Sequence, residues 1–167
     1  MKRNWKRFIS IIGIMVVVLL LVYAGLRLRP TPAPEQRLPS DISGLQLERE
    51  YSGKEAQSIV KRSHLGSLKR PEETSIGYYQ EGLAVWLSEY RESEAASREA
   101  ERMSEAIEKF ARGFSAPQKV VIDGQNVYRT LYQGRFQYFW SKGRFLVYVD
   151  SGPLGQDDLV DLVRKLP

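Results

Sequence analysis

The stretch RFQYFWSKGRFLVYVD, residues 135–150, carries the strongest structural signal in the chain. It holds six aromatic and three basic side chains within sixteen residues. Aromatic rings interleaved with arginines can stack on single-stranded nucleic acid, but the same composition also builds the interior of a β-hairpin. The alternation of side chains along the stretch distinguishes these two interpretations.

A hairpin with Lys142-Gly143 at its turn sorts these side chains onto two distinct sides. One side is then apolar throughout, with the pairs Trp140–Phe145, Tyr138–Val147 and Phe136–Val149. The other side carries Phe139 with Leu146, Gln137 with Tyr148, and Arg135 with Asp150. We therefore expect a core-forming hairpin. Its second side, at Phe139, Leu146 and Tyr148, is a candidate partner surface if no helix covers it.

The distribution of charge argues against nucleic acid as a partner. Residues 1–39 contain seven Lys/Arg and one Asp/Glu, whereas residues 40–167 contain eighteen and nineteen, so the two parts carry +6 and −1. The net charge of +5 therefore belongs to the N-terminal part of the chain. A domain with a charge of −1 lacks the general positive field that phosphate binding needs.

Residues 8–26, FISIIGIMVVVLLLVYAGL, are expected to form a single transmembrane helix. They contain no charged side chain, and nineteen helical residues span about 28 Å, close to the hydrocarbon thickness of a bilayer. Four basic residues precede this segment and Arg27 and Arg29 follow it, which favours a cytoplasmic N-terminus and an extracytoplasmic C-terminal domain. The inverted topology, or a cleaved signal peptide ending near Ala24, are the alternatives.

The chain is thus expected to have four parts. Residues 1–7 form a basic cytoplasmic N-terminus, 8–26 the signal anchor, 27–43 a Pro-rich linker, and 44–167 an extracytoplasmic domain. For the domain the patterns predict the α+β class, with an antiparallel sheet of about five or six strands covered on one face by about three helices. The expected order is α-β-β-α-β-β-β-β-α, with hairpin turns at Glu81-Gly82 and Asp123-Gly124 and a long helix from Ser93.

No catalytic, metal or cofactor site is expected in this domain. The chain has no cysteine and one histidine, His64, so a conventional zinc site lacks ligands. The basic run formed by Lys61, Arg62, His64, Lys69 and Arg70 is a second candidate partner surface, able to bind an anionic group or polymer. The alternative is a solvated helix end and loop.

These observations predict an accessory, assembly or scaffolding protein rather than an enzyme. It would be held in the lipid bilayer by residues 8–26 and would act on a protein partner at the membrane through its exported domain. The alternative is a sensor or binding module for a small ligand or an envelope polymer, with a pocket between sheet and helices.

Overall fold

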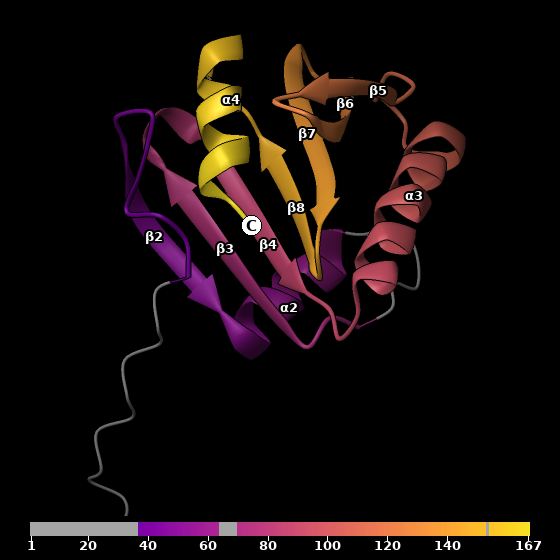
Figure 1. Ribbon diagram of the computed structural model, residues 1–167, viewed down its shortest axis with the longest axis horizontal. Coiled ribbons are helices and arrows are strands. Elements are labelled where there is room, and N and C mark those ends of the chain that lie inside the picture. Colours follow the sequence, from indigo (N-terminus) through magenta and orange to yellow (C-terminus); the bar gives the residue numbers. More distant parts are fainter. Residues whose placement is uncertain (1–36, 64–69, 153) are drawn as a thin grey trace, which may run out of the picture. The chain divides into compact units, whose positions relative to one another are not determined.

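An antiparallel sheet forms the centre of the domain (Figure 1). The computed structural model describes residues 37–63, 70–152 and 154–167, and the predicted membrane span at 8–26 lies outside them. The elements are β1 (Asp41–Ile42), β2 (Leu45–Ser52), α2 (Gly53–Ser63), β3 (Glu73–Tyr79), the short 3-10 helix η1 (Gln80–Gly82), β4 (Ala84–Glu89), α3 (Ser93–Phe110), β5 (Gln118–Ile122), β6 (Gln125–Tyr132), β7 (Arg135–Lys142), β8 (Phe145–Asp150) and α4 (Gln156–Lys165).

The sheet confirms the α+β class and the antiparallel arrangement predicted from the sequence. Its eight strands follow the order β1-β2-β3-β4-β8-β7-β6-β5, so β4 and β8 pair at the centre and each half is a meander of sequential strands. From α2 onward the elements follow the expected order. The strand number exceeds the expected five or six, and β1 is only two residues long, too short to show an alternating pattern of its own.

The hairpin of β7 and β8 keeps the predicted faces in a different register. Its turn is Gly143-Arg144, flanked by the pair Lys142 and Phe145, so Trp140 lies opposite Val147 instead of Phe145. The shift is two residues, and because side chains alternate with a period of two, every side chain stays on its predicted face. Gly143 has a φ of +56°, which suits the first central position of a type II′ turn.

The hairpin of β3 and β4 differs from the prediction by a single residue. Its loop contains three residues, Gln80–Gly82, closed by a hydrogen bond from the amide of Tyr79 to the carbonyl of Leu83. The two-residue turn predicted at Glu81-Gly82 would set Ile76 opposite Leu87, whereas the observed loop sets it opposite Trp86. A shift of one residue reverses the face of a side chain, so Ile76 packs against α2 while Leu87 packs on the opposite side.

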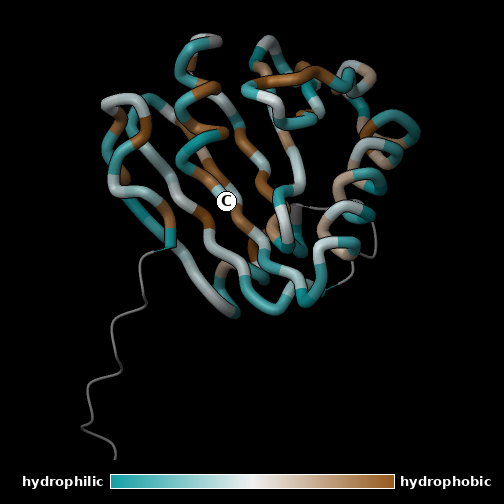
Figure 2. Tube along the Cα trace, in the orientation of Figure 1, coloured by the Kyte–Doolittle hydropathy of each residue, from teal (hydrophilic) through white to brown (hydrophobic). Residues whose placement is uncertain are grey.

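The helices cover both faces of the sheet, which corrects the prediction of a single covered face. On one face α4 packs through Leu159, Leu162, Val163 and Leu166 against the largest cluster, which includes Trp140 and Val147. On the other face α2 packs against Ile76, and α3 packs against Phe139 and Leu146. Figure 2 shows the hydrophobic residues concentrated along the central strands between these two helical layers.

Helix α4 contacts both edge strands of the sheet, β1 and β5. The guanidinium of Arg164 donates two hydrogen bonds of 2.9 Å to the carboxylate of Asp123, in the turn between β5 and β6. The ammonium of Lys165 lies 4.0 Å from the carboxylate of Asp41 in β1. The Nζ of Lys142 donates to the carbonyls of Val163 and Leu166 at the end of the helix. The last helix therefore bridges the two edge strands of the sheet.

The domain begins earlier than the predicted boundary at residue 44. Leu38 and Ile42 are 2 % and 0 % exposed and belong to the cluster beneath α4. The guanidinium of Arg37 forms ion pairs with Glu73 and Glu89, at the start of β3 and the end of β4. Residues 37–43, expected in the linker, are therefore part of the folded unit. The sequence pattern missed them because two apolar residues among prolines and polar residues give no periodicity.

Candidate interaction surface

The predicted partner surface at Phe139, Leu146 and Tyr148 is not open. Phe139 is 0 % exposed and Leu146 is 5 % exposed, and both pack under α3. The helix approaches the sheet closely because its inner side carries the small side chains Ala95, Ala96 and Ala100. The expectation that these two residues could meet a partner is therefore wrong. Helix α3 already occupies their face of the sheet.

Tyr148 is only partly buried, but its polar group is used within the domain. Its phenol donates a hydrogen bond to the Oε1 of Gln137 on β7, and its ring lies 5.2 Å from the ring of Trp86 on β4. Burial raises the pKa of the Tyr148 phenol above its ordinary value, so the group keeps its proton to a higher pH than a phenol in water does. These contacts assign Tyr148 a structural role.

The second predicted surface, the basic run, is described only in part. Lys61 and Arg62 are exposed in the last turn of α2, where positive charge also favours the helix C-terminus. Arg70 is exposed, and its guanidinium donates a hydrogen bond of 3.2 Å to the Oε1 of Gln57 in α2. His64 and Lys69 lie outside the described residues. The run as a whole stays a prediction.

A different pair of side chains forms an apolar surface on the domain. Leu131 on β6 and Phe136 on β7 lie directly opposite each other in the sheet and are 37 % and 46 % exposed. Their side chains point to the face that α4 covers elsewhere, but here the helix leaves them accessible to solvent. Cross-strand neighbours have Cβ atoms about 5 Å apart, so the two side chains form one continuous patch.

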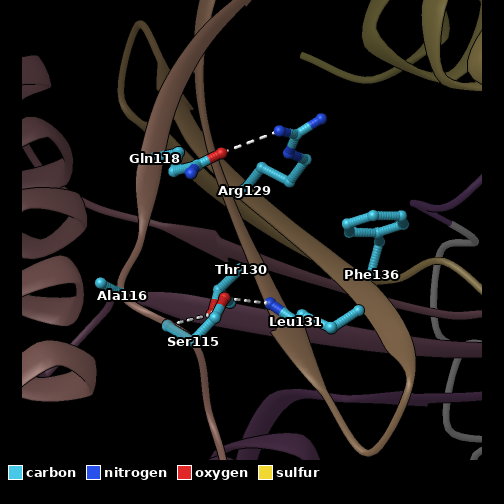
Figure 3. Close-up of a pocket in the computed structure, with 7 residues that line it drawn as sticks. All are labelled: Ser115, Ala116, Gln118, Arg129, Thr130, Leu131 and Phe136. Carbon is cyan, nitrogen blue, oxygen red and sulfur yellow. Dashed lines mark hydrogen bonds between the residues drawn. The ribbon is translucent and has the colours of Figure 1, made fainter.

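This patch borders a shallow pocket of about 300 Å³ (Figure 3). The lining residues come from β6, β7, the first residue of β5 and the segment before it; they are Ser115, Ala116, Gln118, Arg129, Thr130, Leu131 and Phe136. The lining therefore combines apolar surface with several hydrogen-bonding groups and one cationic side chain. We call this set of seven residues the β6–β7 pocket.

Arg129 supplies the only charge that lines the β6–β7 pocket. Its guanidinium carbon lies 5.4 Å from the centroid of the Phe136 ring, and one of its nitrogens donates a hydrogen bond of 2.8 Å to the Oε1 of Gln118. Figure 3 shows the guanidinium between these two side chains. Among the residues that the structure describes, no carboxylate lies within 4.0 Å of Arg129. The guanidinium is thus held in place without an opposite charge.

A break in the edge of the sheet creates the pocket. Phe114 pairs with Tyr132 in an isolated bridge, and regular pairing resumes at Gln118 opposite Arg129. In between, the hydroxyl of Ser115 accepts a hydrogen bond of 2.9 Å from the amide of Leu131, and Thr130 donates one of 2.6 Å to the carbonyl of Ser115. These hydrogen bonds satisfy the backbone amide of Leu131 and the carbonyl of Ser115 where regular strand pairing is interrupted, and the chain between the two pairings bends away from β6.

The β6–β7 pocket lies at the end of the sheet opposite the ion pairs of Arg37. Phe136 is adjacent to the β6–β7 turn, and its carbonyl accepts hydrogen bonds from Ser151, just after the end of β8. Glu89, the partner of Arg37, pairs instead with Phe145 at the start of β8. The pocket and the ion pairs of Arg37 therefore lie near opposite ends of the central strands.

Two further findings concern the described residues alone. They contain no group of three or more His, Cys, Asp or Glu side chains that could hold a metal ion. Within the same ranges, none of the helices combines the length and apolar character that crossing a bilayer requires.

The chain matches no protein-family model, and no curated protein or solved structure shows significant similarity to it. The pocket is therefore interpreted from its own geometry. The sequence did contain one signal for it. The inward positions of β6 are Val127, Arg129 and Leu131, so a charged residue interrupts an otherwise apolar face where the cover of α4 ends.

Proposed function

We propose that this protein is a membrane-anchored, extracytoplasmic interaction module that acts through protein contacts instead of catalysis. The observation that carries the proposal is the paired exposure of Leu131 and Phe136 beside the β6–β7 pocket. Leaving two large apolar side chains side by side in water is unfavourable, and such patches commonly mark binding surfaces. In this role the domain serves as an accessory, assembly or scaffolding component.

The chemistry of the pocket supports binding more than catalysis. The hydroxyl of Thr130 donates a hydrogen bond to the carbonyl of Ser115, and the hydroxyl of Ser115 accepts one from the amide of Leu131. The two hydroxyl groups also lie within hydrogen-bond distance of each other, so both are used to hold the break in the sheet edge. A nucleophilic serine needs an adjacent general base, and the lining contains neither a histidine nor a carboxylate. The remaining groups are apolar surface, one amide and one guanidinium, which suit recognition of another molecule.

Site-specific photo-cross-linking tests the interaction surface. A photoreactive phenylalanine analogue at position 136, in the full chain in native membranes, should give a discrete adduct with one protein. The same analogue at Glu101, an exposed residue of α3, is the matched control and should not give that adduct. Phe136 adducts that contain only this chain, or that match the Glu101 adducts, would contradict the proposal of a distinct partner at this surface.

The anchored topology rests on residues 8–26 and their flanking charges, and it needs its own test. Reporters that are active only outside or only inside the cytoplasm would be fused to the C-terminus of the full chain. We expect activity from the external reporter, together with a protein that remains in the membrane fraction. Activity from the cytoplasmic reporter would refute the proposed location, and a shortened soluble product would instead indicate cleavage near Ala24.

The second candidate function is a sensor or binding module for a small ligand. The pocket volume of about 300 Å³ favours it, because this value lies at the lower end of the range for small-molecule sites. Drug-sized ligands are usually buried over most of their surface, whereas this pocket is shallow and borders an exposed patch. A protein segment that covers both the pocket and the patch fits the geometry better.

A further inference from the structure

We propose that the β6–β7 pocket selects a protein segment in which a carboxylate lies next to an aromatic or aliphatic side chain. This inference rests on the proposed function, since it names the chemistry of the partner at the same surface. The apolar side chain would lie on Leu131 and Phe136, and the carboxylate would pair with the guanidinium of Arg129. Each half of this recognition has a separate structural basis.

The carboxylate half depends first on the charge of Arg129. Several other arginines of the domain, though not all, face carboxylates: Arg37 and Arg144 pair with Glu89, Arg135 with Asp150 and Arg164 with Asp123. Within the described ranges Arg129 has no such partner, and no lining residue of its pocket is acidic. An incoming carboxylate therefore meets a positive charge that no described carboxylate neutralises.

The carboxylate half depends also on the orientation of that charge. The contact with Phe136 and the hydrogen bond to Gln118 hold the guanidinium plane, so an incoming group meets a donor whose position is already fixed. Guanidinium groups present paired N–H donors that match the two oxygens of a carboxylate. A side chain that is ordered before binding also loses less conformational entropy on binding. Arg129 is thus organised for an anion in the absence of one.

The apolar half follows from the position of Leu131 and Phe136. They are direct neighbours across two strands, and the guanidinium carbon of Arg129 is 5.4 Å from the ring of Phe136. One ligand group of the size of phenylalanine can therefore contact the patch while its carboxylate reaches Arg129. The surroundings favour a single carboxylate over a polyanion, because residues 40–167 carry a net charge of −1.

A matched pair of small probes tests this selection. N-acetylphenylalanine carries a ring and a carboxylate, and its amide carries the same ring without the charge. Each would be titrated into the full chain in lipid nanodiscs, with empty nanodiscs as a blank, while the methyl signals of Leu131 are followed by NMR. We expect both to shift the Leu131 signals, with the acid binding about three- to five-fold more tightly, as an exposed ion pair allows.

Substitutions then assign the preference to Arg129. Arg129→Gln should abolish the difference between acid and amide, and Arg129→Lys should retain part of it. Lys119→Gln is the matched control, because Lys119 lies near the Tyr128 ring on the opposite face and its loss removes the same charge without touching the pocket. This control should preserve the full difference.

The outcomes separate the inference from the function on which it rests. Equal binding of acid and amide, with clear Leu131 shifts, would overturn the carboxylate selection and leave the apolar surface intact. Absence of any Leu131 shift with either probe would count against the surface itself. Phenyl phosphate binding more tightly than the acid would overturn the carboxylate assignment in favour of a phosphorylated segment.

Discussion

Two phenylalanines of β7 provide a matched test of how deeply each side chain of the hairpin is buried. Phe139 is 0 % exposed and its ring stacks on Tyr128 at 5.0 Å, whereas Phe136, three residues earlier and on the other face, is 46 % exposed. Burying a phenylalanine removes about 150 Å² from water, which at about 25 cal/mol per Å² is worth about 4 kcal/mol. The stacked contact adds about 1 kcal/mol at Phe139.

We therefore expect Phe139→Ala to lower the free energy of unfolding by about 4 to 5 kcal/mol, and Phe136→Ala by about 2 kcal/mol because roughly half of its ring is already in water. Urea denaturation of the full chain in mild detergent, followed by tryptophan fluorescence, measures both. At a slope of about 2 kcal/mol per M, the two midpoints should differ by more than about 1 M. Equal midpoints, or a lower midpoint for Phe136→Ala, would refute the conclusion that Phe139 is fully buried and Phe136 half exposed.

Three further predictions concern the remainder of the domain. Glu89→Gln should lower the free energy of unfolding by about 1 to 2 kcal/mol at low salt. Glu89 forms ion pairs with Arg37 and Arg144 through its carboxylate and is 8 % exposed, whereas the two arginine side chains are more accessible. An unchanged melting temperature would contradict this prediction. Burial raises the pKa values of Tyr79, Tyr90 and Tyr148, so the folded chain retains these protons to higher pH than the unfolded chain does. Unfolding free energy should therefore hold steady below about pH 10 and fall above it, and Tyr90→Phe should reduce the fall; a pH-independent urea midpoint from pH 9 to 11 would exclude this linkage. Gly152 has a φ of +53°, and a Cβ added there would lie 3.1 Å from the backbone nitrogen of Leu83. Gly152→Ala should therefore lower the free energy of unfolding by about 1 to 3 kcal/mol in the same urea assay. An unchanged midpoint would argue against a strained turn at this position.

The sequence predicts elements and faces well wherever the periodicity is strong. The helix expected from Ser93 is observed as Ser93–Phe110, and the alternation in residues 135–150 assigns each side chain to its correct face. Register is harder, because it depends on the conformation of one or two turn residues. Glu81 adopts a φ of +57° inside a three-residue loop, a conformation that a glutamate does not signal, and the predicted pairing of β3 with β4 is consequently displaced by one residue.

The covering of the sheet could not be derived from local patterns. An apolar stripe shows that a helix packs on something, but α3 and α4 have similar stripes and lie on opposite faces. For the same reason the face of Phe139 was a candidate partner surface if left uncovered and is buried, whereas Phe136 was placed on the fully apolar side and is half exposed. The pocket depends on where α4 stops covering and on how Ser115 bridges the interrupted edge, and both are tertiary features.

The contacts of α4 with both edge strands impose an order on how the domain can be completed. Strand β1 lies near the start of the folded unit, whereas Leu162 and Leu166, which cover the sheet between its edges, follow every strand in the sequence. A nascent chain can form its hairpins early, but the apolar face of the sheet stays uncovered until residue 166 is available. A chain that has made its hairpins but not this helix would expose the apolar face beneath it, and such exposed surface favours aggregation.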